Sequence, residues 1–230
     1  MKEFFGNSLF FAVTISLLSY QFGVWVKKKT KCSILNPLLV SIVIVIGILL
    51  LFDIDYEYYE AGSSALNYLL TPATVALAVP LYRQMEVLKK YGAAIVAAIL
   101  SGVLTSLIST AALAFLFRLR YEEYVTLLPK SITTAIGMVV SEQLGGLVTI
   151  TVAVIVVTGI IGNVLAEGLC RLFRIREKVA VGLALGTSAH AVGTARAMEM
   201  GEIEGAMSSV AIVLSGIFTV LLANLFTLIY

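Results

Sequence analysis

Long runs without a charged residue dominate this sequence and decide what it can fold into. The runs Leu38 to Phe52, Ala93 to Phe117 and Leu147 to Leu165 contain no Asp, Glu, Lys or Arg. Only 13% of the 230 residues are charged, whereas about a quarter are charged in a typical soluble domain. Since a helix crosses a bilayer with roughly 20 apolar residues, the chain is predicted to be an all-α polytopic membrane protein. We expect one membrane domain over 1–230, multi-pass in the cell (inner) membrane.

Apolar stretches predict about seven or eight segments. They cover 4–26, 36–52, 62–82, 91–117, 125–143, 147–169, 179–198 and 206–229. Basic loops, which favour the cytoplasmic side, lie at 27–31, 83–90 and 171–178, whereas the acidic loop 53–60 suits the outside. Segment 36–52 is therefore predicted to run outward and 147–169 to run inward. The net charge of +2 gives no indication of a nucleic-acid partner.

Two topologies stay open between those segments. If 62–82 and 91–117 each cross once, then 125–143 begins and ends outside, as a re-entrant hairpin or a surface helix. Its Pro129 and Lys130 fit that position. In the alternative, 62–82 is re-entrant and 125–143 crosses.

Two stretches that are predicted to lie at membrane depth differ in composition from an uninterrupted transmembrane helix. Leu70 to Pro80 and Gly186 to Arg196 are rich in Gly, Pro, Thr, Ser and Ala. Lipid offers no partner to a free backbone N–H or C=O, so broken helices occur inside the protein or beside a water-filled cavity, where they commonly form solute sites. The pair therefore predicts discontinuous helices and favours a transporter.

An internal similarity indicates a repeat. Residues 96–107 and 210–221 align at a constant offset of 114, with seven of twelve pairs identical. The halves then cover roughly 36–117 and 147–230. Because 36–52 and 147–169 are predicted to run in opposite directions, we expect two inverted repeats that bring their broken helices together near the midplane.

His190 is the only histidine and lies in the second interrupted stretch. It is either a hydrogen-bonded packing residue or a proton carrier, since imidazole titrates near neutral pH and ionisable groups in membranes are functional candidates. No second His and no nearby Cys support a metal site. Ser188 and His190, two residues apart, face different directions on a helix, so no enzyme and no cofactor is expected.

The cations and hydroxyls near the breaks predict a site for a small oxyanion. Arg196 either reaches to the interface or pairs with a carboxylate in the cavity, and Lys130 is either interfacial or a cation over the anion. Restarting helices direct N–H groups at an anion. The predicted substrate-binding residues are Thr71, Pro72, Ala73, Thr74, Lys130, Ser131, Thr133, Thr134, Gly186, Thr187, Ser188, His190, Gly193, Thr194 and Arg196.

The stretches 70–82, 128–134 and 186–209 resemble the LrgB/CidB family, and the likeness runs over nearly the whole chain. This family includes bacterial antiholin-like and holin-like proteins linked to murein hydrolase activity and autolysis. It also includes the C-terminal half of the plastid glycolate/glycerate translocator. Bacterial members work beside a small LrgA/CidA-type partner, and some are implicated in pyruvate movement.

The resemblance implies two functions. The first is a proton-coupled carrier of small carboxylates such as glycolate, glycerate or pyruvate, working by alternating access of two inverted halves with His190 in the proton role. The alternative is an antiholin-like or holin-like regulator of autolysis that acts with the LrgA/CidA-type partner. Broken helices and buried ionisable groups favour the carrier. A homodimer is compatible with either function, and a passive channel stays open.

Overall fold

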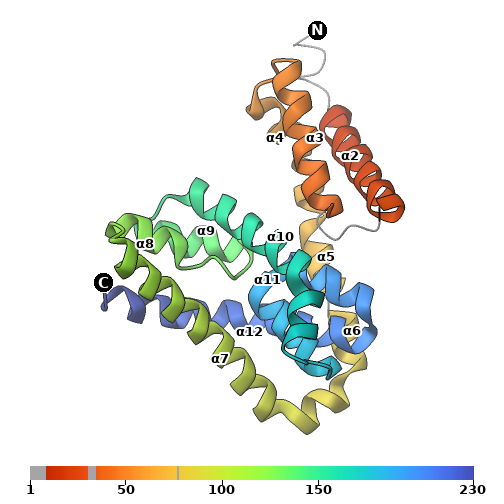
Figure 1. The fold of residues 1–230 in the computed structure, drawn as a ribbon. Coiled ribbons are helices and arrows are strands. Elements are labelled where there is room, and N and C mark those ends of the chain that lie inside the picture. The colour runs from red at the N-terminus through yellow and green to blue at the C-terminus, as the bar shows by residue number, and fades with distance from the viewer. Residues whose placement is uncertain (1–8, 31–34, 77) are drawn as a thin grey trace. The chain divides into compact units, whose positions relative to one another are not determined.

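The computed structural model describes residues 9–30, 35–76 and 78–230, and the regular structure of these residues is helical throughout (Figure 1). Within them, four helices are long and apolar enough to cross a membrane: Phe10–Thr30, Met85–Phe117, Val148–Leu172 and Glu202–Thr227. The helix Pro37–Leu51 is apolar but shorter. The predicted all-α membrane class is confirmed, while residues 4–8 of the first predicted segment lie outside the described residues.

The chain divides into two compact units, Met1–Ala76 and Leu77–Tyr230, which are described separately here. Their boundary falls inside the predicted segment 62–82 rather than between the predicted halves 36–117 and 147–230. A single membrane domain over the whole chain stays a prediction.

The first unit contains α2 (Leu9–Thr30), α3 (Pro37–Leu51), α4 (Tyr56–Tyr68) and α5 (Leu70–Ala76), and α2 packs against α3 and α4. Asn36 begins α3, because its side chain accepts a hydrogen bond from the Leu38 N–H at 2.8 Å and Pro37 supplies a preset φ for the first turn. On α2, Gly23 allows this start to come close: a Cβ there would lie 2.7 Å from the Pro37 carbonyl oxygen.

The predicted interruption of segment 62–82 is present. The structure ends α4 at Tyr68 and begins α5 at Leu70, so the helix is interrupted at Leu69, and α6 (Ala78–Arg83) begins beyond the undescribed residue 77. Pro72 lies in the first turn of α5, where its missing N–H costs no intrahelical bond. A helix therefore restarts close to Thr71 and Pro72, as the sequence predicted.

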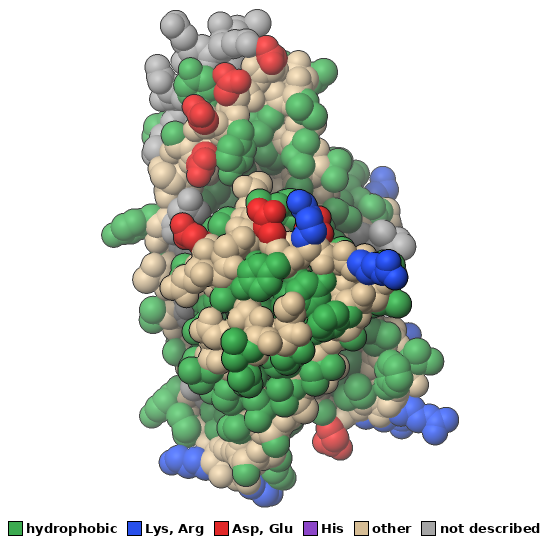
Figure 2. Space-filling view, turned by 90° about the vertical axis from the view of Figure 1, so that its left-hand side faces the viewer, with side chains coloured by type: hydrophobic (Ala, Val, Ile, Leu, Met, Phe, Trp, Pro, Cys, Tyr) green, Lys and Arg blue, Asp and Glu red, His purple; other side chains and the backbone are tan. Residues whose placement is uncertain are grey.

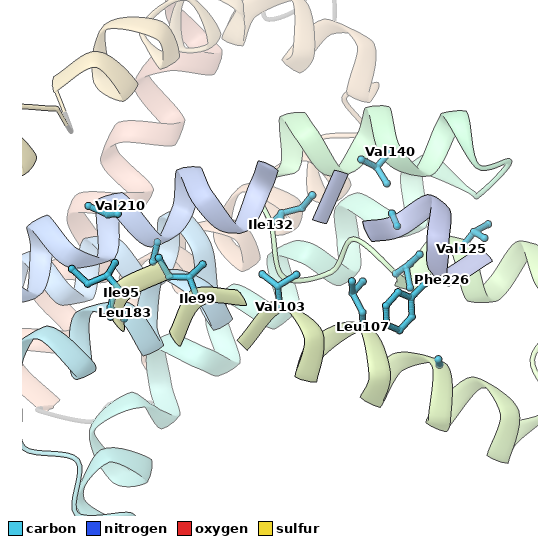
Figure 3. Close-up of a cluster of buried hydrophobic side chains, with 14 of the residues drawn as sticks. Ile95, Ile99, Val103, Leu107, Val125, Ile132, Val140, Leu183, Val210 and Phe226 are labelled. Carbon is cyan, nitrogen blue, oxygen red and sulfur yellow. The ribbon is translucent and has the colours of Figure 1, made fainter. Parts of the chain in front are cut away.

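The second unit is built around a core between two long helices. It contains α6, α7 (Met85–Phe117), α8 (Tyr121–Leu127), α9 (Thr134–Gln143), α10 (Val148–Leu172), α11 (Lys178–Met200) and α12 (Glu202–Thr227). Figure 3 shows one face of α7, from Ile95 through Ile99 and Val103 to Leu107, packed toward α12. The core contains buried residues from α7, α8, α11 and α12 together.

The α7 and α12 helices run in the same direction. Near their starts, Arg83 Nη1 lies 3.5 Å from Glu202 Oε1. Near their ends, the Tyr230 hydroxyl donates to the Ala114 carbonyl at 3.3 Å and to the Leu119 carbonyl. A strict inversion of the two repeat copies would set these helices antiparallel, so the predicted inverted repeat is not shown in this pair.

The predicted segment 125–143 is a helical hairpin that enters and leaves at the same end. From the end of α7 the chain runs back along α7 as α8, until the Ser131 hydroxyl lies 2.9 Å from that of Ser106. It then reverses and returns as α9, so that the Leu147 N–H reaches the Thr126 hydroxyl at 2.8 Å. Pro129, which cannot continue a helix, lies in the turn. Of the two predicted forms of this segment, the structure has the re-entrant one.

The α11 helix contains a second reversal, at His190, which has φ 41° and ψ −131°. The halves on either side of it pack against each other, because Val181 and Leu185 share a small core with Ala197 and Met200. The predicted segment 179–198 therefore returns to the end at which it started. This reversal is the physical reason that α12 runs parallel to α7.

The two described basic loops of the second unit lie at one end. Tyr91, after the basic residues of 83–90, lines the same cavity as Phe173 and Ile175 of the basic loop 171–178. The preference of Lys and Arg predicts that this end faces the cytoplasm, and the α8–α9 hairpin enters from the opposite end. Figure 2 shows hydrophobic side chains over much of the visible face, as expected for surfaces in contact with lipid.

Replacing Gly186 by Ala should destabilise the second unit, because a Cβ there would lie 2.4 Å from the Ser208 carbonyl oxygen on α12. We expect a loss of about 1–3 kcal/mol, as is typical of overpacking, measured as a lower midpoint of thermal unfolding in detergent. Gly168→Ala is the matched control, since nothing lies within 4 Å of its added Cβ. Equal midpoints for both variants would contradict the close α11–α12 contact.

Candidate functional site

A cavity of about 1120 Å³ lies within the second unit. Its walls come from α7, the tip of the α8–α9 hairpin, α10 and the first half of α11. Of the predicted site residues, it brings together Lys130, Ser131, Thr187 and Ser188. The cavity therefore joins the two reversals that enter the unit from opposite ends.

Lys130 is the cation of this cavity. Its Nζ donates to the Ser106 hydroxyl at 2.9 Å and to the Ser131 hydroxyl at 3.3 Å. Throughout the part of the chain that the structure describes, no carboxylate lies within ion-pair distance of this ammonium group. A charge held by hydroxyls alone at membrane depth is costly, so Lys130 has an unused capacity to bind an anion.

Hydroxyl groups follow one face of α7 along the cavity wall. Ser101, Thr105 and Ser109 recur every four residues, and each donates to a carbonyl of its own helix. Thr158 of α10 faces the same cavity. A hydroxyl that turns away from its helix carbonyl can donate to a ligand instead, so this wall can bind polar groups without a second charge.

The break at His190 is fastened to α10 and does not line the cavity. The His190 Nε2 lies 3.0 Å from the Ile155 carbonyl oxygen, and only 4% of the residue is exposed. Because a carbonyl only accepts, Nε2 carries the proton of this hydrogen bond. The Val192 carbonyl, just beyond the break, accepts from the Asn163 amide at 3.0 Å.

Glycine on α10 makes room for the histidine ring. A Cβ on Gly159 would lie 2.7 Å from His190 Cε1 and 2.8 Å from Nε2. The backbone of His190 is in the left-handed region, which L-residues rarely adopt and which costs of order 1–3 kcal/mol. The ring contacts with α10 offset part of that cost, so His190 and Gly159 together maintain the reversal.

Three other predicted residues of this stretch have packing roles. Gly186 lies against α12, Gly193 lies against the Leu185 carbonyl of the facing half-helix, and Thr194 bonds the Ser208 hydroxyl at 2.7 Å. None of them lines the cavity. The expectation that the restarting helix points its N–H groups into the cavity is therefore wrong for α11, because the reversal is turned toward α10.

Arg196 is paired, and it too lies outside the cavity wall. Its guanidinium contacts Glu167 of α10 and lies 2.5 Å from Glu199. Two carboxylates neutralise this cation and fasten the second half of α11 to α10. The structure thus separates the two predicted cations, since only Lys130 faces the cavity.

The remaining predicted residues lie elsewhere. Thr71, Pro72 and Ala73 are exposed on α5 in the first unit, and the side chain of Thr74 lies outside the described residues. Thr133 is the N-cap of α9 and Thr134 is the first residue of that helix, and neither lines the cavity. The participation of these residues stays a prediction.

Ser106 was missed by the sequence analysis, although it contacts Lys130 directly. The signal was present, because Ser and Thr recur along 101–110 with the spacing of one helical face. No group of three or more His, Cys, Asp or Glu that could hold a metal ion occurs among the residues that are described.

Comparison with known proteins identifies the relatives of this chain. The model of the LrgB-like family matches residues 16–229. The protein named "Antiholin-like protein LrgB" of Bacillus subtilis (strain 168) is 37% identical over 220 residues, covering 95% of this chain and 95% of that protein. "Uncharacterized protein YwbG" of the same strain is 41% identical over 184 residues, covering 80% of this chain and 82% of the relative.

A further relative, "Antiholin-like protein LrgB" of Bacillus cereus (strain B4264), is 36% identical over 218 residues, which are 94% of this chain and 95% of the relative. No solved structure matches the chain.

Gly159→Ala should displace the His190 ring, because the new methyl group would overlap it. The chain has one histidine, so its imidazole NMR resonances are unambiguous. We expect a changed Nε2 chemical shift, since the hydrogen bond to the Ile155 carbonyl is lost or lengthened. Gly168→Ala serves as the control, and unchanged imidazole resonances in Gly159→Ala would count against the described ring contact.

Proposed function

The chain belongs to the LrgB-like family, and from this premise we propose that it is a membrane carrier of small carboxylates that binds them at Lys130. Glycolate, glycerate and pyruvate are the solutes to test first. Participation of Thr71 to Thr74 in solute binding is part of the proposal. The basic loops would face the cytoplasm of a bacterial inner membrane.

The observation that carries this proposal is the ammonium group of Lys130 in the cavity, held by two serine hydroxyls and by no described carboxylate. A carboxylate would replace neutral acceptors with a charged one, and such hydrogen bonds are about twice as strong. Neighbouring hydroxyls could bind the 2-oxo or 2-hydroxy group of the solute. The cavity is far larger than a three-carbon acid, so water would accompany the solute.

Two reversals that enter from opposite ends support a carrier rather than a fixed pore. The α8–α9 hairpin and the hairpin within α11 both border the cavity, and discontinuous helices of this kind form solute sites in secondary transporters. Movement of one hairpin at a time would expose the site alternately to the two sides. In this proposal His190 carries the coupling proton through its second ring nitrogen, although the ring lies behind the cavity wall.

The names of the relatives favour a second function. Two of them are named antiholin-like, so this chain is alternatively a regulator of autolysis that acts with an LrgA/CidA-type partner. Such a role is compatible with carriage if the effect on the cell wall follows from movement of a metabolite or of protons. A homodimer is compatible with both functions.

The experiment is solute transport by purified protein in liposomes. Saturable counterflow of labelled pyruvate, glycolate or glycerate is the expected result. Flux that rises linearly with concentration would indicate a channel, and flux of large dyes would indicate a membrane lesion. If the protein without a partner moves none of these acids, autonomous carriage of them is excluded.

Lys130→Gln should weaken carboxylate binding, because among the described residues Lys130 is the cation that bonds the cavity hydroxyls. Hydrogen bonds to charged groups contribute about 1.5–3 kcal/mol, so we expect the half-saturation concentration of counterflow to rise by about 10-fold to 100-fold. Lys130→Arg should retain part of the affinity.

Lys89→Gln is the control for Lys130→Gln. It removes the same charge from an exposed residue that does not line the cavity. It should leave the half-saturation concentration unchanged. Equal effects of both substitutions would mean that the anion responds to the net charge of the protein and not to a direct contact with Lys130. The proposed binding of carboxylates by Lys130 would then be wrong.

His190→Gln tests the proton role. Glutamine can still donate to the Ile155 carbonyl but does not titrate, so the pH dependence of flux between about pH 5 and 8 should be lost while flux itself persists. The measurement is initial flux against pH at fixed solute concentration. A pH profile identical to that of the parent protein would remove His190 from the coupling mechanism.

A further inference from the structure

We propose that the tip of the α8–α9 hairpin is a gate operated by the solute itself. Binding of a carboxylate at Lys130 would release the contact between Ser131 and Ser106 that holds this hairpin against α7. The inference depends on the proposed carboxylate site and adds to it the element that moves and the bond that controls it.

The hairpin is firmly attached to α10. The Thr151 hydroxyl donates to the Thr126 carbonyl at 2.9 Å and lies 2.7 Å from the Ser141 hydroxyl, and both contacts are buried. The Leu147 N–H donates to the Thr126 hydroxyl at 2.8 Å. Gly137 lies directly under the Ile155 side chain. These contacts join α10 and the arms of the hairpin into one rigid element, and the tip residues Lys130 and Ser131 take no part in them.

The attachment of the hairpin tip to α7 is of a different kind. Its polar part consists of the hydrogen bond between the Ser106 and Ser131 hydroxyls, at 2.9 Å, and the bond from Lys130 Nζ to Ser106, also at 2.9 Å. Its apolar part is Leu128 and Ile132, which are buried in the core shared with α7. The three residues of the polar part are only half-buried and line the cavity. A ligand in the cavity can therefore compete for these bonds.

The other end of the hairpin provides the pivot. Far from the tip, the buried Tyr124 hydroxyl donates to the Phe226 carbonyl at 3.1 Å. Between that bond and the tip, α9 faces α12 at Gly216, where Ile136 is the neighbouring side chain. Both contacts fix the base and the α9 arm of the hairpin to α12, so movement in this proposal is confined to the tip.

A carboxylate would break the tip contact by a simple exchange of donors. In the described state, one serine hydroxyl donates to the other, and the ammonium group donates to both. A carboxylate presents two charged acceptor oxygens, which attract the ammonium and both O–H groups more strongly than a neutral hydroxyl does. Once both hydroxyls donate to the ligand, the direct hydrogen bond between Ser106 and Ser131 is gone and only apolar packing joins the tip to α7.

The direction of this movement fits alternating access. The cavity is bordered by basic-loop residues at one end, whereas the hairpin closes it from the other. Separation of Ser131 from Ser106 would open the cavity toward the end at which the hairpin enters. The empty site would keep this gate closed, because the serine pair then has no competing acceptor.

The test is a reversible cross-link across the gate. Ser106→Cys and Ser131→Cys are combined in a protein whose Cys32 and Cys170 are replaced by Ser, and the pair is joined by oxidation or by a short bis-thiol reagent. Because both hydroxyls belong to the proposed site, the reduced double variant rather than the parent protein sets the reference flux. Cross-linking should abolish that flux, and a reductant should restore it. Added carboxylate should slow the cross-linking, whereas an uncharged amide of the same acid should not.

A second pair controls for the chemistry. Ser141→Cys with Thr151→Cys joins α9 to α10 inside the rigid element, so its cross-linking should leave the flux intact. Undiminished flux after the 106–131 cross-link, failure of that pair to cross-link, or a cross-linking rate indifferent to carboxylate would each overturn the gate. Absence of flux in the cysteine-replaced parent would instead overturn the proposed function, so the two failures are distinguishable.

Discussion

Backbone groups that leave helical geometry at membrane depth must find their partners inside the protein, and the second unit is organised around this requirement. At His190 the chain reverses, and α10 supplies both the Asn163 amide, which donates to the Val192 carbonyl, and the space beside Gly159 for the ring. At the other reversal, the Thr126 hydroxyl satisfies the Leu147 N–H. One helix, α10, therefore contacts both hairpins, and a displacement of α10 would change the position of each of them.

Small residues make this support possible. Gly159 admits the His190 ring, Gly162 lies against Ala189, and Gly102 of α7 approaches Thr187. Close approach of helices in a membrane depends on such residues, since lipid provides no hydrophobic drive for helix association. The glycines of this chain are thus concentrated where half-helices and full helices cross, and the cavity is the space left between α7 and this tightly packed group.

Charge placement separates structural from functional candidates within that arrangement. Arg196 contacts two carboxylates and fastens α11 to α10, whereas Lys130 lies in the cavity with hydroxyl partners. Membership of the LrgB-like family is compatible with both a metabolite carrier and an antiholin-like regulator. The position of one incompletely compensated ammonium group is the reason that we favour carriage of an anion.

The sequence by itself determined the helical membrane class, the interruptions near Pro72 and His190, and the resemblance to the family, because apolar run length and local breaker residues are properties of short segments. Only the tertiary structure decided that 125–143 and 179–198 both turn back, that α12 runs parallel to α7, and that Lys130 rather than Arg196 faces the cavity. Those outcomes depend on contacts between residues far apart in the chain, such as Ser106 with Ser131 and His190 with Ile155. A segment that turns back inside the membrane can have the same local composition as one that crosses it. The two differ in which neighbouring helix supplies hydrogen-bond partners to the backbone groups that leave helical geometry.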